Sequence, residues 1–233
     1  MAAGGLAKSL TLKDEVADFK RRRIREEACR LFYQEGYENT TLEAVAKTLH
    51  ITKPSIYLHY ANKGELLFDI CKTGISLSLD AVERAVALRT APRQRLSILI
   101  ESVLDIIFDY QDFIVVYTRE EKHLDRIQAR TIRELRSAFD HKLGTLLAQG
   151  SAESDLSVED PVLTATTIGG IMTWVSLWYS PSGKRTRIEI TAHVKEMIMR
   201  LVQVSAELPE PPVSRVQPIV SLNEQALESE SHD

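Results

Sequence analysis

Side chains that can bind phosphate oxygens or base edges gather in one short segment, TTLEAVAKTLHITKPSIYLHYANKGELL, which spans residues 40–67. Hydroxyl groups, ammonium groups and the free amides at a helix N-terminus all suit contacts with the sugar–phosphate backbone of DNA. Two helix-like runs with a short break between them occupy this segment. The candidate DNA-contacting residues are Thr40, Thr41, Thr52, Lys53, Pro54, Ser55, Tyr57, His59 and Lys63.

This pattern predicts a helix-turn-helix, whose second helix enters the major groove with its N-terminal residues facing the bases. Lys53 would lie at the tip of that helix, and Lys63 would meet a phosphate at the start of the following helix. The basic run KRRRIR, residues 20–25, could reach flanking phosphates. The same periodicity also fits an ordinary pair of packed helices, in which Tyr57 and Tyr60 would be core aromatics.

The charge distribution favours a local DNA-binding surface over a generally basic protein. The whole chain carries 29 Lys and Arg against 33 Asp and Glu, which gives a net charge of −4. Residues 20–72 alone hold ten Lys or Arg and seven Asp or Glu. This segment is therefore net basic inside an acidic protein, as a localised nucleic-acid contact requires.

Helical periodicity extends over nearly the whole chain and strand-like alternation is nearly absent, so we predict an all-α protein. The first helix is expected to begin near Lys20 and to end at Gly36, and Asn62 is expected to cap a long helix. The β-branched run at residues 114–116 is short and has helical flanks, which favours a helix there. VLTATTIGGIMTWVSLWY is apolar almost all round, which predicts burial on most sides.

The expected architecture is an N-terminal three-helix helix-turn-helix domain followed by a helical bundle for ligand binding and dimerisation. Residues 1–19 are interpreted as a flexible arm, residues 20–68 as the DNA-binding domain and residues 69–203 as the bundle. Residues 204–233 are predicted to be a disordered tail, because four prolines, six acidic residues and one arginine occur from residue 206 onwards.

Several classes of protein are disfavoured. No apolar run reaches the roughly 18 residues that cross a bilayer, and the N-terminus lacks a signal-peptide pattern. The two cysteines, Cys29 and Cys71, are not expected to form a disulfide, which fits a cytoplasmic protein. The histidines lack zinc-binding spacing and no nucleophile elbow is present, so we expect no metal and no cofactor. A small helical enzyme and a helical interaction protein are the alternatives from other classes.

Residues 24–67 resemble the DNA-binding domain of the TetR family of one-component repressors. The matching positions are Phe32, Gly36, Tyr37, Thr40, Thr41, Val45, Ala46, Tyr57, His59, Tyr60, Lys63 and Leu66. His50 departs from the pattern, because the family more often has glycine in this turn. The resemblance implies a homodimer that binds a roughly palindromic operator in double-stranded DNA and that a small-molecule effector releases.

The C-terminal part resembles the TetR-type regulators that respond to acyl-coenzyme A thioesters. Those proteins share the pattern Trp-x-x-x-Trp-Tyr/Phe-x-Pro-x-Gly, which TWVSLWYSPSG matches, and an Arg–Glu pair on an earlier helix, which TREE matches. Thr173 stands where those relatives often have asparagine. The resemblance implies control of fatty-acid or related catabolic genes and an effector site made by Tyr117, Arg119, Glu120, Trp174, Trp178 and Tyr179.

Alternatives remain for this second segment. Trp174 and Trp178 lie one turn apart on a helix, an arrangement that suits a hydrophobic core or a dimer interface as well as a ligand wall. The effector could also be an uncharged hydrophobic compound, as in a regulator of an efflux or stress operon. If it is a coenzyme A thioester, its phosphates need cations, for which the candidates are Arg119, Lys122, Lys184, Arg185 and Arg187.

The homodimer is predicted to form through the last two long helices, at roughly residues 160–180 and 186–203. Apolar positions recur there at helical spacing, so four helices across a two-fold axis could bury them together. The positions expected to be buried in this interface are Ile168, Ile171, Ile190, Val194, Ile198 and Leu201.

Overall fold

The structure, a computed structural model, describes residues 11–203. All regular elements in this range are helical, so the all-α prediction is confirmed. The arm predicted for residues 1–19 lies in part outside the described residues, and the tail predicted for residues 204–233 lies wholly outside them. The helices are α1 (Leu12–Glu35), α2 (Leu42–Thr48), α3 (Lys53–Tyr57), α4 (Lys63–Ala87), α5 (Pro92–Asp109), α6 (Gln111–Glu120), the 3-10 helix η1 (Glu121–His123), α7 (Arg126–Ala152), α8 (Pro161–Trp178) and α9 (Arg187–Leu201).

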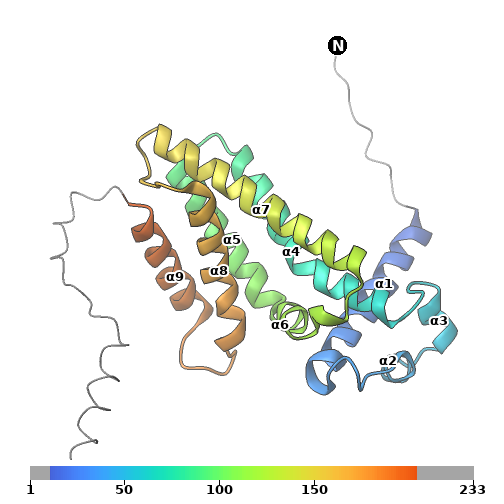
Figure 1. Ribbon diagram of the computed structural model, residues 1–233. Coiled ribbons are helices and arrows are strands. Elements are labelled where there is room, and N and C mark those ends of the chain that lie inside the picture. Colours follow the sequence, from blue (N-terminus) through green and yellow to red (C-terminus); the bar gives the residue numbers. More distant parts are fainter. Residues whose placement is uncertain (1–10, 204–233) are drawn as a thin grey trace, which may run out of the picture. The chain divides into compact units, whose positions relative to one another are not determined.

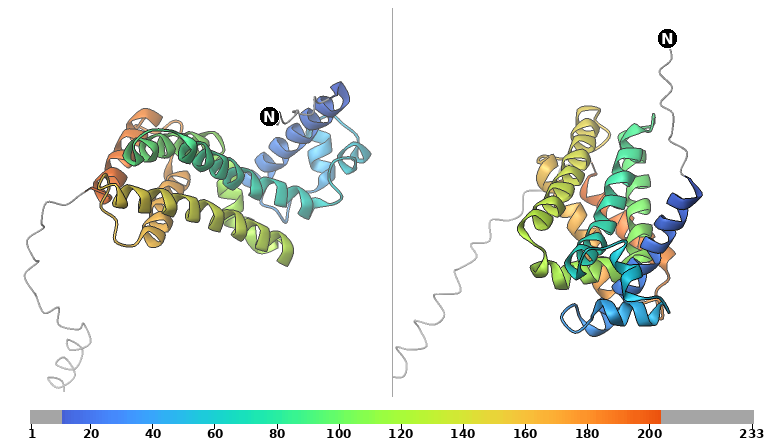
Figure 2. Two further views of the ribbon diagram at one scale, coloured as in Figure 1. Left: turned by 90° about the horizontal axis from the view of Figure 1, so that it is seen from above. Right: turned by 90° about the vertical axis from the view of Figure 1, so that its right-hand side faces the viewer.

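The helices form the two predicted groups, which share α4 (Figures 1 and 2). Helices α1, α2 and α3 pack together at the N-terminal end of α4 and make the helix-turn-helix domain. Helices α5 to α9 form the bundle, in which α7 runs alongside α4. Helix α4 is therefore the covalent and packing link between the two groups.

The first helix begins earlier than the sequence suggested. The Thr11 hydroxyl accepts from the Asp14 amide while the Asp14 carboxylate accepts from the Thr11 amide, which together form a capping box. Residues 12–19 are therefore helical, and the interpretation of this stretch as a loose arm is wrong. The helix ends at Gly36, whose φ of +83° and ψ of 156° are accessible only to glycine, so the predicted cap is confirmed.

The turn of the helix-turn-helix contains a strained residue. The Thr41 hydroxyl caps α2 by accepting from the Ala44 amide at 3.1 Å. Helix α2 then ends near Leu49, and His50 adopts a φ of +53° in the left-handed region. A side chain in this conformation costs about 1–2 kcal/mol, which glycine avoids. The motif keeps its geometry in spite of this cost.

Two hydrophobic cores are present, and the first one crosses the domain boundary. The core of the helix-turn-helix domain includes Ile56, Tyr60 and Leu66, which are almost fully buried. It also includes Val116 of α6 and Ile132 of α7, which belong to the bundle. The second core lies within the bundle and joins α5, α7, α8 and α9 to the later turns of α4. Packing therefore continues from one group of helices to the other through a shared set of apolar side chains.

Helix α8 is less buried than its apolar sequence predicts. Ile168, Met172 and Val175 enter the bundle core, but Trp174 is 64% exposed and Trp178 is 49% exposed. One face of α8 therefore carries large apolar side chains that no described residue covers.

The structure of the described residues also gives observations on membrane-crossing helices, metal-binding groups and the two cysteines. None of the helices described here is long and apolar enough to cross a membrane. Residues 11–203 contain no group of three or more His, Cys, Asp or Glu that could hold a metal ion. Cys29 and Cys71 are both free and buried, and burial raises the pKa of the Cys71 thiol to about 12. These thiols are therefore core residues at neutral pH.

Candidate nucleic-acid interface and ligand cavity

Helix α3 presents a polar surface because its apolar side chains are anchored on the opposite side. Ile56 is completely buried and Tyr60, just after the helix, is 1% exposed, so both anchor this segment in the core of the helix-turn-helix domain. Thr52, Lys53 and Pro54 are exposed at the start of the helix, and Tyr57 is 46% exposed one turn later. The N-terminal turn of α3, the part that meets base edges in a helix-turn-helix, is thus free to approach DNA.

Local contacts already hold several of these polar groups in place. The Thr52 and Ser55 hydroxyls lie 2.8 Å apart, and Lys53 forms an ion pair with Glu43 of α2. The Lys53 ammonium also lies 5.7 Å from the centre of the Tyr57 ring. Both members of the Lys53–Glu43 pair are about half exposed, so this pair is weak and exchanges readily for a phosphate.

Three predicted contacts need correction or restriction. Thr40 is fully buried and its hydroxyl donates to the Gly36 carbonyl at 2.9 Å, so its side chain serves the fold. Thr41 is exposed, although its hydroxyl is used as a helix cap. Burial and, to a smaller extent, the positive charges of Arg21 and Lys20 lower the pKa of His59. His59 is therefore neutral at pH 7 and offers a hydrogen bond rather than a charge.

Lys63 has a structural role that its spacing did not reveal. Its ammonium donates to the carbonyl oxygens of Tyr37 at 2.9 Å and Thr40 at 3.1 Å, with Glu38 at 3.4 Å. It also lies 4.2 Å from the centre of the Tyr37 ring. The Lys63 ammonium therefore donates hydrogen bonds to the carbonyl oxygens of the turn between α1 and α2 and does not point away from the protein.

We expect Lys63→Met to lower the free energy of unfolding by about 2 kcal/mol, because it leaves several carbonyl groups without their charged donor. Urea unfolding measures this change, and Lys72→Met, on an exposed part of the same helix, is the matched control. A drop of about one in the salt slope of DNA binding with unchanged stability would instead assign Lys63 to a phosphate.

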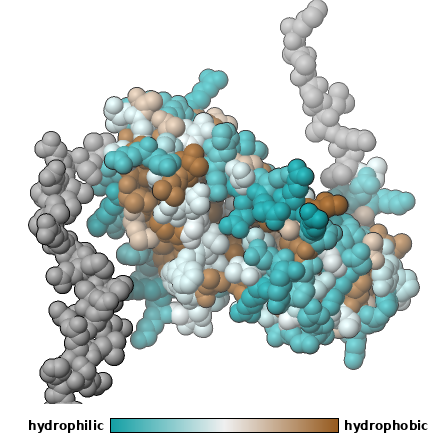
Figure 3. All heavy atoms as spheres, viewed as in Figure 1, coloured by the Kyte–Doolittle hydropathy of each residue, from teal (hydrophilic) through white to brown (hydrophobic). Residues whose placement is uncertain are grey.

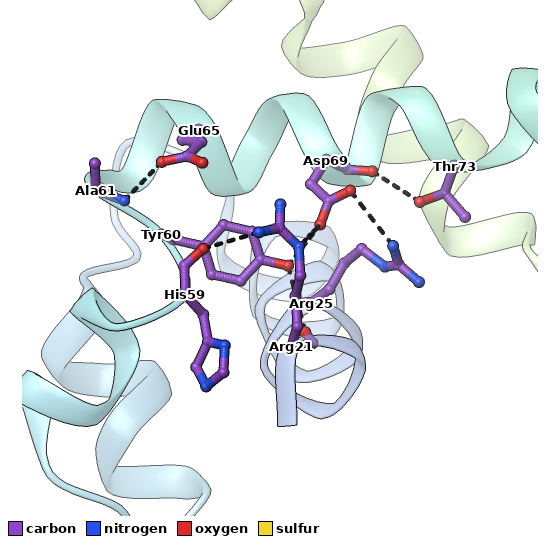
Figure 4. A network of polar contacts seen from close by, with 8 residues as sticks. All are labelled: Arg21, Arg25, His59, Tyr60, Ala61, Glu65, Asp69 and Thr73. Atoms are coloured by element: carbon purple, nitrogen blue, oxygen red, sulfur yellow. Dashed lines mark hydrogen bonds and ion pairs between the residues drawn. The ribbon is translucent and has the colours of Figure 1, made fainter. Parts of the chain in front are cut away.

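The basic run at residues 20–25 is only partly available for DNA, because two of its arginines bind Asp69 of α4 (Figure 4). Arg21 Nε lies 3.1 Å from Asp69 Oδ2, and Arg25 Nη1 lies 3.4 Å from Asp69 Oδ1. The Tyr60 hydroxyl donates to Asp69 Oδ2 at 2.6 Å. Burial raises the pKa of Tyr60, so this hydroxyl keeps its proton.

The same network reaches the end of the recognition segment. Arg21 Nη1 donates to the His59 carbonyl at 3.0 Å, and the Arg21 guanidinium lies 4.4 Å from the centre of the Tyr60 ring. One carboxylate on α4 thus holds α1 and the segment that follows α3 in a fixed relation (Figure 4). We call Arg21, Arg25, Tyr60 and Asp69 the Asp69 network.

A cavity of about 440 Å³ lies in the bundle, between α4, α5, α6, α7 and α8. Most of its wall is apolar, which suits a ligand with a hydrocarbon part. Its apolar lining includes Ile75, Val103, Ile107, Phe113, Ile114, Phe139, Met172, Trp174 and Leu177.

The polar part of this cavity contains one cation and two carboxyl groups. Arg136 Nη1 donates to the Tyr117 hydroxyl at 3.1 Å, and Glu121 lines the cavity with them. Burial raises the pKa of Asp140, which also lines the cavity. Thr166 donates to Asp140 at 3.5 Å. Arg136, Asp140 and Thr166 could not be found from the sequence, because polar residues at their positions in α7 and α8 look like ordinary surface residues.

The predicted effector residues separate into different places. Tyr117 and Trp174 line the cavity, as does Thr173. Arg119 lies over the Tyr33 ring at 5.3 Å, and Glu120 accepts from the Tyr37 amide at 3.4 Å. These two residues therefore contact the helix-turn-helix domain and do not line this cavity.

The end of α8 has its own set of contacts. The Tyr179 ring packs against Phe108 with 4.7 Å between ring centres, and its hydroxyl accepts from Arg187 at 3.2 Å. Arg187 also pairs with Asp109 at 2.6 Å, which ties the start of α9 to α5. Tyr179 and Trp178 do not line the cavity, so their predicted place in it is corrected.

A broad groove lies on the outer faces of α8 and α9, where Figure 3 shows apolar atoms beside hydrophilic ones. Ile168 and Ile198 are fully buried in the subunit's own core, so they are not available to a partner as predicted, while Ile190 and Val194 are mostly buried at the base of the groove. Leu201 remains 51% exposed. The groove is lined by a set that includes Ile171, Trp174, Trp178, Arg185, Glu189, Ile190, His193, Val194 and Met197.

Two family descriptions match the part of the chain that contains these sites. "Bacterial regulatory proteins, tetR family" matches residues 24–70, and "Tetracyclin repressor-like, C-terminal domain" matches residues 89–202. The chain belongs to the TetR family. TetR proteins are transcription regulators and not enzymes, so the alternative of a small helical enzyme is set aside.

Its similarity to individual TetR proteins is distant. The transcriptional repressor KstR2 of Mycolicibacterium smegmatis is 23% identical over 158 residues, which cover 67% of this chain and 77% of KstR2. AibR, solved in complex with isovaleryl coenzyme A and operator DNA, is 25% identical with a TM-score of 0.67, and the match covers 76% of this chain and 97% of AibR. The regulator YerO of Bacillus subtilis is 31% identical over 104 residues, which cover 43% of this chain but only 36% of YerO.

Proposed function

We propose that this TetR protein is a repressor that binds an operator as a homodimer and that a small molecule in the bundle cavity releases it. Four exposed residues, from the N-cap of α3 to its last residue, supply the DNA-reading surface: Thr52, Lys53, Pro54 and Tyr57. The groove on α8 and α9 supplies a self-complementary face for the partner subunit, because a two-fold axis brings the same patch of each subunit together.

The observation that carries this proposal is that the cavity and the DNA-reading domain share α4. Cys71, Gly74, Ile75 and Ser78 of α4 line the cavity. Asp69, two residues before Cys71 on the same helix, binds the other three members of the Asp69 network. A ligand that favours a shifted α4 would therefore move the recognition segment of each subunit. It can weaken operator affinity only as far as it binds the shifted state more tightly, and a tenfold effect needs about 1.4 kcal/mol.

For the effector we propose an acyl-coenzyme A thioester, which would place the regulated genes in fatty-acid or related catabolism. The apolar cavity suits an acyl chain, and the AibR relative was solved with isovaleryl coenzyme A. Glu121 and Asp140 face the cavity beside a single arginine, Arg136. This arrangement disfavours the carboxylate of a free acid relative to a neutral thioester carbonyl.

The test is a gel shift of the purified protein on its operator, with isovaleryl, octanoyl and palmitoyl thioesters and the matching free acids. We expect at least one thioester to release the DNA at concentrations where its free acid does not. Release by free acids or by an uncharged hydrophobic compound alone would favour the rival regulator of an efflux or stress operon.

A pair of variants at Ser78 connects release to the cavity. Ser78 lines the cavity and its hydroxyl donates to the Gly74 carbonyl at 3.0 Å. Ser78→Phe is expected to keep operator binding and to lose release, because the added ring occupies the cavity. Ser78→Ala, which removes only the hydroxyl, should respond like the unmodified protein.

A further inference from the structure

Three of the five cations that the sequence offered for an anionic ligand lie away from the ligand cavity. Arg187 pairs with Asp109, Arg185 pairs with Glu189, and Arg119 lies over Tyr33. None of the three lines the cavity of about 440 Å³. A ligand whose acyl chain occupies this cavity therefore needs a source of positive charge that reaches the cavity wall.

The N-terminal half of α7 offers that source. Arg126, Arg133 and Arg136 form no ion pair with any residue in the range 11–203, whereas Arg130 between them pairs with Glu134. All three are exposed and lie on one side of the helix, since they are spaced by seven and three residues. At 1.5 Å of rise per residue they extend over about 15 Å. Figure 3 shows hydrophilic side chains gathered on the visible face of the molecule where α7 runs in Figure 1.

Arg136 connects this row of charges to the cavity. It is the one cation among the cavity-lining side chains of the described range, and its guanidinium already donates to the Tyr117 hydroxyl there. Arg133 lies one turn before it and does not line the cavity. The row of exposed arginines on α7 therefore ends at the cavity, whose wall is mostly apolar.

We propose that the phosphates of a coenzyme A thioester bind Arg126, Arg133 and Arg136 while its acyl chain occupies the cavity. This inference rests on the proposed function and assigns a site for the nucleotide part of the effector. Guanidinium groups bind phosphate oxygens in a bidentate manner, which makes arginine suited to this task. The thioester carbonyl then lies near Arg136 and Tyr117, where the polar part of the cavity begins.

The experiment compares two sets of ligands by the fluorescence of Trp174 and Trp178. One set is isovaleryl, octanoyl and palmitoyl coenzyme A, and the other is the same acyl groups on pantetheine, which lacks the phosphates. We expect the coenzyme A thioesters to bind more tightly. Arg133→Ala should weaken their binding about tenfold and leave the pantetheine thioesters unaffected, because it removes one charged contact outside the cavity.

Matched variants separate this contact from a general effect of charge. Arg89→Ala changes the net charge by the same amount, but Arg89 follows the C-terminal end of α4 and is not part of the arginine row. This variant should therefore bind both sets of thioesters like the unmodified protein. Arg133→Lys should recover most of the affinity for coenzyme A thioesters, because it restores a cation.

Three results would overturn the proposal. Equal affinity for both sets of thioesters would show that the phosphates make no contact, while the proposed effector function would stand. Binding of neither set, with no release of operator, would remove the thioester effector and this site together. A loss of operator affinity in Arg133→Ala without any ligand would assign the arginine row to DNA.

Discussion

Replacing Trp178 with aspartate is expected to lower operator affinity by about a hundredfold or more, because it separates the subunits that read the two halves of the operator. Trp178 lies in the groove on α8 and α9 and is 49% exposed, but it does not line the ligand cavity. Large aromatic side chains at the centre of an interface commonly dominate its energy. A carboxylate there would be buried without a partner on association.

The size of this effect follows from bivalency. When two linked reading heads bind one DNA molecule, the second contact is intramolecular and raises affinity by roughly 10²–10⁴. Sedimentation should show Trp178→Asp as a monomer at micromolar concentration, and a gel shift should show the loss of operator binding. Leu88→Asp, at the end of α4, is the control and should remain a dimer. A dimeric Trp178→Asp with normal operator affinity would place the interface elsewhere.

Local signals made the elements predictable from the sequence. Gly36 and Asn62 mark the end of α1 and the start of α4 because each acts within a few residues, through backbone conformation or a side-chain cap. The apolar periodicity of residues 160–180 and 186–203 made α8 and α9 equally clear. The sequence pattern did not predict the first turns of α1. Their apolar residues, Leu12, Val16 and Phe19, are exposed and pack on no core.

The roles of individual site residues depended on contacts between distant parts of the chain. The position of Lys63 indicated a phosphate contact, yet its ammonium binds carbonyl groups more than twenty residues away in sequence. Ile190 and Val194 were correctly seen as buried positions, but periodicity does not distinguish a subunit's own core from an interface. Arg136 belongs to no sequence motif, because only the tertiary fold brings its guanidinium to the Tyr117 hydroxyl.

The Asp69 network is expected to be the most sensitive polar site in the helix-turn-helix domain. Asp69→Asn should lower the free energy of unfolding by about 2–3 kcal/mol, because it removes the shared counter-ion of two partly buried arginines. The Nε atom of Arg25 is buried and has no hydrogen-bond partner within residues 11–203, so Arg25 depends strongly on this carboxylate.

The consequence of Asp69→Asn for DNA binding follows from the contact between Arg21 and the His59 carbonyl. Once Arg21 loses its partner on α4, the segment after α3 is no longer held at a fixed distance from α1, so operator affinity should fall by about tenfold under conditions where the protein remains folded. Tyr60→Phe, which removes one hydrogen bond and keeps the packing, should cost only about 1 kcal/mol. Asp80→Asn is the matched control, because Asp80 is exposed on the same helix and forms no ion pair within the described range. Urea unfolding and gel shifts of these three variants measure both effects. If Asp69→Asn were as stable as Asp80→Asn and bound the operator equally well, α4 would control the recognition segment through its apolar contacts alone, and the carboxylate would have no part in transmitting the ligand's effect.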